Sequence, residues 1–196
     1  METRVPLNEV KDLTIKFASP RDVILLYTFY QSLSSKTKEF FHPPYFDPKY
    51  GLKFILYLIT LLFSTINPVR AFLKIFFPKV VILPLIAMNE NDVIGFAYLK
   101  IKSRIVHNEY NSELGIVVRE EYQGMGVGSK LMQCLLNNAQ KEKISRIRLI
   151  VDKRNEKAIH LYKKFGFKIT RMIENGDFYD GKCYTICEMM LKFKKA

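Results

Sequence analysis

Residues 119–131 read REEYQGMGVGSKL and place three glycines within five residues, directly before a segment with helical spacing. Glycine destabilises a helix, so glycines here indicate that bare backbone is needed where a helix begins. A helix N-terminus exposes unpaired N–H groups and the positive end of the helix dipole. Without side chains in the way, a phosphate group can approach these N–H groups closely. The stretch therefore predicts a phosphate-binding turn.

Two common phosphate-binding signatures do not fit this turn. The triphosphate loop GxxxxGK[ST] fails because, counted from Gly124, Ser129 stands where Gly is needed and Lys130 is not followed by Ser or Thr. The dinucleotide fingerprint GxGxxG also fails, because it needs a glycine at position 129 and a place after the first strand of a repeated β-α-β series. A third signature, Q/R-x-x-G-x-G/A, is matched by Gln123, Gly126 and Gly128.

Alternating and helical patterns predict the other elements of the chain. The first half contains a strand (Asp12–Ala18), a helix from Arg21 to about Ser34, a proline-rich connector (41–51), an apolar segment, and two strands joined by a turn at Asn89–Asp92, with Pro84 limiting where regular pairing begins. The second half contains a strand (113–118), a helix from the glycines to about Lys143, a strand (146–152), a helix (155–165) stopped by Gly166, and two strands around the turn NGDFYDGK (175–182). This order predicts one α/β domain over residues 1–196, with a largely antiparallel first half and one β-α-β crossover.

The apolar segment, at about 51–78, is the unusual part of the chain. Residues 54–63 read FILYLITLLF without a charge, and VRAFLKIFF (69–77) places its apolar residues on one helical face. The first stretch is shorter than the ~20 residues of a membrane span. We expect a helical insert that is buried or forms a homodimer contact through 52–77; a lid over an apolar acceptor and a peripheral membrane contact remain open.

Composition limits the class of protein without naming a ligand. The 196 residues carry a formal net charge of +12, so an anionic ligand or surface is expected, and charge alone does not choose among a phosphorylated cofactor, nucleic acid and lipid. The first ten residues lack the apolar core of a secretion signal. Three cysteines without a C-x-x-C pair argue against structural zinc and for reduced thiols, so we expect a cytoplasmic protein without a metal.

The sequence from Glu113 to Phe167 resembles the GNAT family, the general N-acetyltransferases that use acyl-coenzyme A (acyl-CoA). The strand LGIVV (114–118), the glycine turn, the strand RLIVD (148–152) and NEKAIHLYKKFGF (155–167) follow one another as in the family core. The last piece is similar to the family signature N-x-x-A-I-x-L-Y-x-x-x-G-F. Outside residues 113–167, the two ends of the chain agree with the family only in the order of their secondary-structure elements. The implied fold class is α/β, a GNAT-like mixed sheet flanked by helices, with the apolar helical segment after the first helix.

The resemblance implies a binding site for acetyl-CoA. In the family, the pyrophosphate sits on the backbone amides of the glycine turn, and the pantetheine arm pairs with the fourth strand like an added strand. Asn155 matches a residue that hydrogen-bonds the cofactor, and it is also a natural helix N-cap. The implied cofactor-binding residues are Ile116, Val117, Val118, Gln123, Gly124, Met125, Gly126, Val127, Gly128, Ser129 and Asn155.

The resemblance also implies catalytic roles. Tyr162, seven residues after Asn155 on the same helical face, would protonate the departing thiolate, although a tyrosine there can also be a core residue. Glu113 is the candidate base for the amine, with a solvated strand end as the alternative, and the Val118 amide would stabilise the oxyanion. Ile150 stands where ribosomal-protein acetyltransferases often carry glutamate, which argues against that subclass. His42, His107 and His160 are interpreted as surface or packing residues.

Together these features predict an N-acetyltransferase that moves an acetyl group from acetyl-CoA to a primary amine by direct attack in a ternary complex. A small-molecule amine is the favoured acceptor, and a protein or peptide amine (N-terminal or lysine) is the alternative. A non-catalytic CoA-binding module that meets a membrane or nucleic acid is the rival from another class. The retained turn and Tyr162 favour an enzyme, and nucleic acid is not expected as its partner.

Overall fold

The computed structural model describes residue 10 and residues 12–41, 80–102 and 112–193. The apolar segment at 51–78, His42 and His107 lie outside these ranges. The helical insert and the homodimer or membrane contact predicted for that segment therefore stay predictions, as does the single domain over 1–196.

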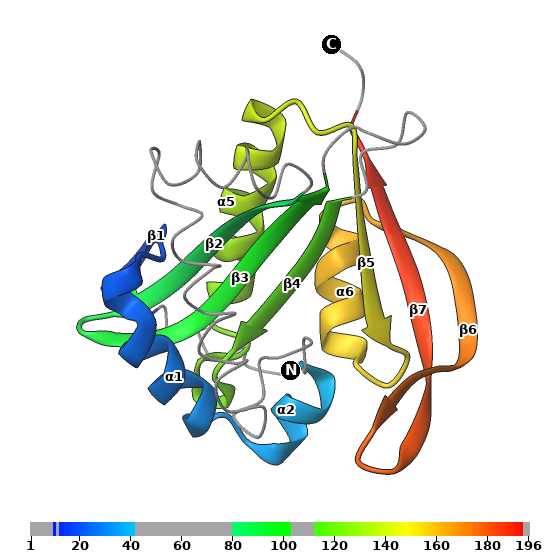
Figure 1. Ribbon diagram of the computed structural model, residues 1–196, viewed down its shortest axis with the longest axis horizontal. Helices are drawn as coiled ribbons and strands as arrows, with labels where there is room; N and C mark the ends of the chain where they lie inside the picture. Colours follow the sequence, from blue (N-terminus) through cyan, green and yellow to red (C-terminus); the bar gives the residue numbers. More distant parts are fainter. Residues whose placement is uncertain (1–9, 11, 42–79, 103–111, 194–196) are drawn as a thin grey trace, which may run out of the picture.

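Seven described strands form one mixed sheet in the order β1-β2-β3-β4-β5-β7-β6 (Figure 1). Neighbouring strands run antiparallel except β4 and β5, which are parallel and are connected through a helix. The strands are β1 (Leu13–Phe17), β2 (Val80–Asn89), β3 (Asp92–Lys102), β4 (Ser112–Val118), β5 (Arg146–Asp152), β6 (Lys168–Tyr179) and β7 (Lys182–Lys192). This sheet confirms the predicted fold class and its crossover.

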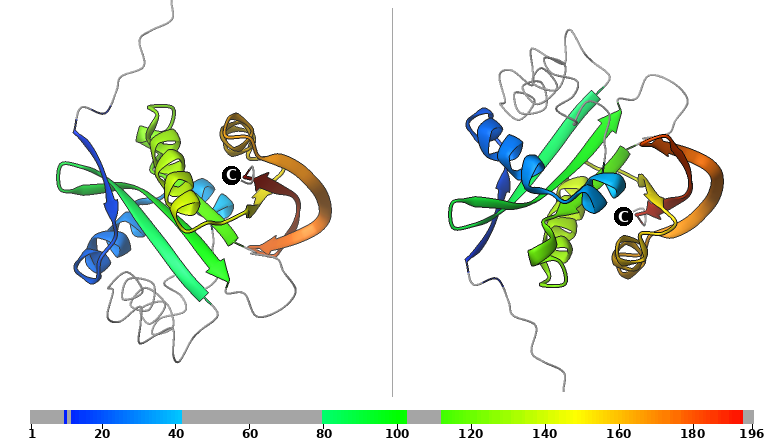
Figure 2. Two further views of the ribbon diagram at one scale, coloured as in Figure 1. Left: turned by 90° about the horizontal axis from the view of Figure 1, so that it is seen from above. Right: turned by 90° about the horizontal axis from the view of Figure 1, so that it is seen from below.

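Helices cover both faces of the sheet (Figure 2). The longer described helices are α1 (Val23–Ser32), α5 (Val127–Lys141) and α6 (Glu156–Lys164), with the short α2 (Ser35–Phe40) and the 3-10 turns η1 (Pro20–Asp22) and η3 (Glu120–Tyr122) between elements. The buried stripe of α5 and the inner side of α6 share one apolar cluster with one face of the sheet. Helix α1 packs in a second cluster on the other face. No helix in the described ranges has the length and apolarity that a bilayer span requires.

The predicted helix from Arg21 to about Ser34 is wrong in its boundaries. It starts as η1, becomes α1 at Val23 and ends at Ser32, because Leu33 adopts an extended conformation with ψ 141°. Ser34 then starts α2, since its hydroxyl accepts a hydrogen bond from the Thr37 amide at 3.1 Å. The sequence therefore specifies two helices where we predicted one.

Two strand predictions also need correction. Regular pairing of β2 with β3 starts at Val80, before Pro84, rather than after it. The Pro84 carbonyl accepts from the Ala18 amide, just past the last β1 residue. A residue's nitrogen lies on the same side of a strand as its carbonyl, so the Pro84 nitrogen faces the end of β1 and no bond to β3 is lost. At the other end of the chain, the turn at 175–182 is mostly strand: a bulge between Ile173 and Asp177 lets β6 run on to Tyr179.

The N-terminal end of α1 is held by a buried carboxylate. Asp22 is 4% exposed and accepts hydrogen bonds from the Ser19 amide and hydroxyl, each at 2.8 Å, and from Lys16 at 2.9 Å. Burial disfavours ionisation of Asp22, but the hydrogen bonds from Lys16 and Ser19 outweigh it and lower the pKa of this carboxyl below its ordinary 3.8. Strand β1 and α1 are thereby tied together.

We predict that Asp22→Asn lowers the free energy of unfolding by about 1–3 kcal/mol at neutral pH, because charge-assisted hydrogen bonds to a buried group are lost. A lowered folded-state pKa stabilises the fold above the unfolded pKa, and this contribution disappears as the pH falls through the folded pKa. Urea unfolding of both proteins should therefore give stabilities that converge in acid. A difference that stays constant down to the acid limit would contradict the ionised role of Asp22.

Candidate active site

The two parallel strands at the centre of the sheet separate soon after they meet. Their register contains only Ser112 with Ile147 and Glu113 with Arg148. Beyond these two pairs β5 continues to pair with β7 as far as Asp152, whereas β4 continues to pair with β3 as far as Val118. Within the described residues, the edge of β4 from Leu114 onward that faces β5 therefore has no partner strand, and we call this unpaired side of β4 the opening.

The backbone of β4 alternates between β3 and this opening. The Arg119 amide donates to the Ile94 carbonyl at 2.9 Å, which fixes the alternation in an antiparallel ladder. Val117 consequently turns its amide and carbonyl toward β3, while Ile116 and Val118 turn theirs toward the opening. The Val118 carbonyl accepts from Gln123 Nε2 at 3.0 Å. An extended ligand can therefore use the backbone of Ile116 and the amide of Val118.

The glycine turn lies where β4 ends and α5 begins. Gly124 and Gly126 both have a φ of +83°, a left-handed conformation that side chains disfavour, and Gly126 is the N-cap residue of α5. Among the described residues, and apart from each glycine's own chain neighbours, no heavy atom lies within 4 Å of where a Cβ would stand on either glycine. Val127 is fully buried, which leaves its side chain in the core and only its backbone for a ligand. The first amides of α5 are thus exposed at a bare surface suited to an anion.

Gly128 lies where α5, α6 and β4 come together. A Cβ there would lie 3.4 Å from Leu161 Cδ2 on α6 and 3.8 Å from Val118 Cγ2 on β4. Both distances are ordinary contacts, so the fold leaves room for a methyl group, in line with the Gly or Ala that the signature allows at this position.

Asn155 and Tyr162 lie on α6 as the spacing predicted. Asn155 is the N-cap, and its Oδ1 accepts from the Ala158 amide at 3.2 Å, which leaves the two N–H groups of its side chain available to a ligand. Tyr162 is 5% exposed, and its ring lies 5.9 Å from that of Phe167. Burial raises the pKa of the Tyr162 phenol, so the group stays protonated at physiological pH. A protonated phenol can act as an acid.

Glu113 occupies the closed end of the opening. It lies in the second of the two β4–β5 pairs, and its carboxylate is 3.8 Å from Lys100 Nζ on β3. Both side chains are one-third exposed, so solvent reaches this pair. Glu113 therefore lies beside a cation, five positions before Val118 on the same strand. His160 is exposed on α6, in line with the surface role expected for it.

One feature that the sequence analysis missed is an aromatic side chain beside the opening. Tyr98 on β3 pairs in register with Gly115 on β4, and a Cβ on Gly115 would lie only 2.4 Å from Tyr98 Cε1. The Tyr98 ring thus covers the backbone of Gly115 on the sheet face that α1 packs against. A glycine inside a strand is the sequence signal for such an approach, and it does not say which ring arrives.

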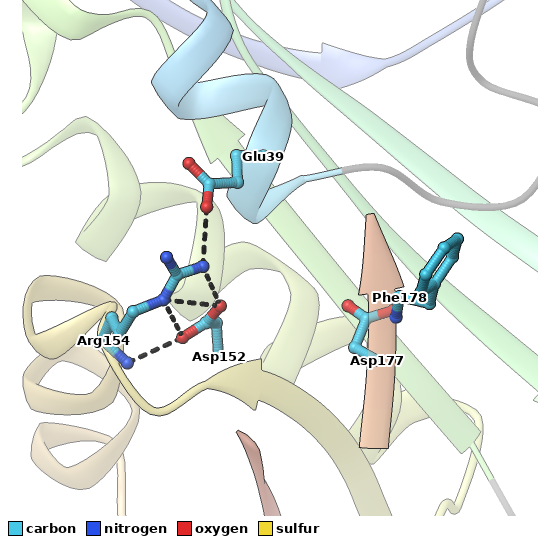
Figure 3. A network of polar contacts seen from close by, with 5 residues as sticks. All are labelled: Glu39, Asp152, Arg154, Asp177 and Phe178. Carbon is cyan, nitrogen blue, oxygen red and sulfur yellow. Dashed lines mark hydrogen bonds and ion pairs between the residues drawn. The ribbon is translucent and has the colours of Figure 1, made fainter. Parts of the chain in front are cut away.

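A second missed feature is a polar cluster beside the end of β5, formed by Glu39, Asp152 and Arg154 (Figure 3). The Arg154 guanidinium lies between the two carboxylates, with Nη2 2.6 Å from Asp152 Oδ2 and 2.7 Å from Glu39 Oε1. Its position next to Asn155 was the only hint in the sequence. Among the described residues, no three His, Cys, Asp or Glu side chains are arranged to hold a metal ion.

Comparison with known proteins points to one family. A sequence model described as the acetyltransferase (GNAT) family matches residues 63–167. Spermidine N(1)-acetyltransferase of Escherichia coli is 33% identical over 79 residues, which cover 40% of this chain and 42% of that protein. Spermine/spermidine N(1)-acetyltransferase of Bacillus subtilis is 31% identical over 93 residues, which cover 45% of this chain and 61% of that protein. The match therefore spans less than two thirds of the length of either relative.

Solved structures agree with the fold over nearly the whole chain. A GNAT-family acetyltransferase from Streptococcus pneumoniae has a TM-score of 0.67 at 23% identity, covering 93% of this chain and 100% of that one. Spermidine N-acetyltransferase from Vibrio cholerae, in complex with CoA and spermine, has a TM-score of 0.65 at 18% identity, covering 92% of this chain and 95% of that one. At such identities the likeness concerns the fold.

We predict that Gly126→Ala weakens CoA binding about tenfold or more in titration calorimetry, because its methyl group would cover the bare backbone of the turn. It should also lower the melting temperature, because alanine disfavours the φ of +83°. Gly181→Ala in the β6–β7 turn is the control: with a φ of +75°, it should lower the melting temperature and leave CoA binding intact. Equal CoA affinity in wild type and Gly126→Ala would show that this turn does not bind the cofactor.

Proposed function

Because this chain belongs to the acetyltransferase (GNAT) family, we propose that it transfers the acetyl group of acetyl-CoA to a primary amine of a small molecule. The observation that carries the proposal is the opening beside β4, which has the glycine turn at one end, with helix α6 next to this turn (Figure 1). Helix α6 carries Tyr162 and has Asn155 as its N-cap. One end of the opening suits a pyrophosphate, and its wall offers backbone groups to an extended chain.

Each cofactor contact follows from the groups that remain available. The pyrophosphate accepts hydrogen bonds from backbone amides between Gly124 and Ser129, including those of Met125 and Val127, and Gln123 shapes the entry by holding the Val118 carbonyl. The pantetheine amides pair with the backbone of Ile116, and the Val118 amide is left for the thioester oxygen. Val117 contributes as part of the strand rather than by a bond of its own, since its polar groups face β3. The Asn155 side-chain amide donates to the cofactor while its oxygen keeps the N-cap bond.

The reaction follows as direct attack in a ternary complex. The acceptor amine loses its proton to Glu113 through a chain of water molecules, because Glu113 lies five residues from Val118 along the extended strand β4. The lone pair of the amine forms the new C–N bond at the thioester carbon. The Val118 amide stabilises the negative oxygen of the tetrahedral intermediate. When the C–S bond breaks, the Tyr162 hydroxyl donates its proton to the leaving thiolate. Tyr162 then regains a proton from solvent or from the product, and no residue is acylated.

A small amine is favoured as the acceptor over a protein. The relatives in Escherichia coli and Bacillus subtilis are named for spermidine and spermine, so polyamines are the first acceptors to test. Ile150, where we expect glutamate in ribosomal-protein acetyltransferases, is 44% exposed on β5. A protein or peptide amine remains the alternative, and a CoA-binding module without turnover is the rival. A cytoplasmic setting is part of the same proposal.

The test is release of free thiol from acetyl-CoA in the presence of a panel of amines. We expect saturable turnover with spermidine or spermine, at a kcat/KM at least about tenfold above that for peptides with a free N-terminus or lysine. A higher kcat/KM for the peptides would favour the protein-directed alternative. Saturable CoA binding in calorimetry with no thiol release for any amine would make the chain a binding module.

We predict that Tyr162→Phe lowers kcat by about 10²-fold or more, the range expected for loss of a positioned acid. The phenylalanine keeps the ring contact with Phe167, so the melting temperature and the dissociation constant of CoA should change little. Steady-state kinetics and calorimetry on the same preparation separate the two effects. An unchanged kcat would remove Tyr162 from the mechanism.

A further inference from the structure

Helix α2 connects the two strand ends that border the opening. At its start, the Ser34 amide donates to Glu120 Oε1 at 3.3 Å, and the Ser34 hydroxyl also donates to this oxygen. Glu120 lies two residues after the end of β4. Near the end of α2, Glu39 accepts from Arg154, which lies two residues after the end of β5. The helix therefore bridges the place where β4 and β5 have separated.

The contacts at the β5 end converge on one guanidinium. Arg154 donates to both oxygens of Asp152, with Nε at 3.0 Å from Oδ1 and Nη2 at 2.6 Å from Oδ2, and its backbone amide donates to Oδ1 at 2.8 Å. The third partner is Glu39 Oε1, 2.7 Å from Nη2. The guanidinium carbon also lies 3.9 Å from the centre of the Tyr184 ring and 5.5 Å from that of Phe40. Arg154 thus joins β5, β7 and α2.

This cluster differs from an ordinary surface ion pair. Exposed pairs of long side chains contribute little because both chains must be ordered. Here the Asp152 side chain is only 7% exposed, and it holds the guanidinium in a two-pronged arrangement before Glu39 adds its bond. Glu39 itself is 26% exposed. Arg154 is therefore preordered by β5 and offers α2 a fixed partner.

Helix α2 depends on such partners. It has six residues, none of them buried, whereas α1 places Leu26, Phe29 and Tyr30 in the core. A helix of this length is not stable by itself. The residues on either side of it, Leu33 and Phe41, are buried and anchor its two ends in the core. The polar links to Glu120 and Arg154 therefore fix the exposed turn of α2 between these two anchors.

We propose that Arg154 is a positioning residue, which fixes α2 over the separated ends of β4 and β5 and thereby makes α2 the wall on the acceptor side of the active site. Arg154 does not touch the reacting atoms. Its guanidinium holds Glu39, and through Glu39 the helix, on the sheet face opposite α5. The kinetic part of this inference rests on the proposed acetyl transfer.

The experiment compares Arg154→Ala, Arg154→Lys and Glu39→Gln with Lys153→Ala, which removes a neighbouring exposed cation outside the cluster. We expect Arg154→Ala and Glu39→Gln to raise the acceptor KM about tenfold, the effect of one lost charge-assisted hydrogen bond, with the KM for acetyl-CoA within about twofold of wild type. Arg154→Lys keeps the positive charge but not the bidentate geometry of the guanidinium, so its acceptor KM should lie between those of wild type and Arg154→Ala. Lys153→Ala should behave as wild type.

The double variant Glu39→Gln/Arg154→Ala should be no worse than Arg154→Ala, since both changes break one link. An acceptor KM for Arg154→Ala equal to that for Lys153→Ala would overturn the proposal, and so would additive losses in the double variant. If Arg154→Ala unfolds below the assay temperature, Glu39→Gln decides, because it keeps the pair of Arg154 with Asp152.

Hydrogen exchange gives a readout that needs no turnover. The amides of Lys38 and Phe41, which donate to Ser34 and Thr37 at 2.9 Å, should exchange faster in Arg154→Ala and Glu39→Gln than in Lys153→Ala. Equal exchange in all variants would overturn the link to α2. A wild-type protein that acetylates no amine would refute the proposed function, and the exchange rates would still decide whether Arg154 positions α2.

Discussion

The short parallel contact between β4 and β5 is the constraint on which the rest of the structure depends. Both strands have their other edges satisfied, β4 by β3 and β5 by β7, so two residue pairs are enough to join the halves of the sheet. Beyond those pairs the inner edge of β4 has backbone groups that need partners. Gln123 satisfies one carbonyl, and the remaining groups are left to a ligand or water. Helices α5 and α6 begin at this opening, and α2 links its two sides.

The elements around the opening were predictable because their signals are local. The bounds of β5 were predicted to the residue, and the positions of Asn155 and Tyr162 followed from helical spacing. The failures involve longer-range information. Pro84 fits within a strand because β1 ends beside it, and Asn175 adopts a φ of 51° within the β6 bulge instead of a turn. Sequence patterns identify the residues that favour breaks, but neighbouring strands decide whether the break occurs.

The candidate site likewise contains residues with local sequence signals and residues that are brought together only by long-range contacts. Gly124, Gly126 and Gly128 stand out in the sequence because glycine weakens a helix start unless the bare backbone has a use there. The pairing of Glu39 with Arg154 joins residues 115 positions apart, and each of these residues alone resembles any surface charge. The approach of Tyr98 to Gly115 requires the register of β3 with β4, which alternation does not fix. These long-range contacts of the site could therefore be identified only from the structure.

This division has a physical origin in how the two substrates would be held. Acetyl-CoA would be bound mainly through backbone amides and carbonyls, which every residue supplies, so only the glycines and the helix start must be specified by sequence. The acceptor would meet side chains from α2, β3 and β5, whose identities can change without altering the sheet. The part of a GNAT site that binds the cofactor can thus be identified from a contiguous sequence motif. The part that would bind the acceptor depends on long-range contacts such as that of Glu39 with Arg154. Recognition of the family therefore comes from the sequence, and recognition of the acceptor requires the geometry.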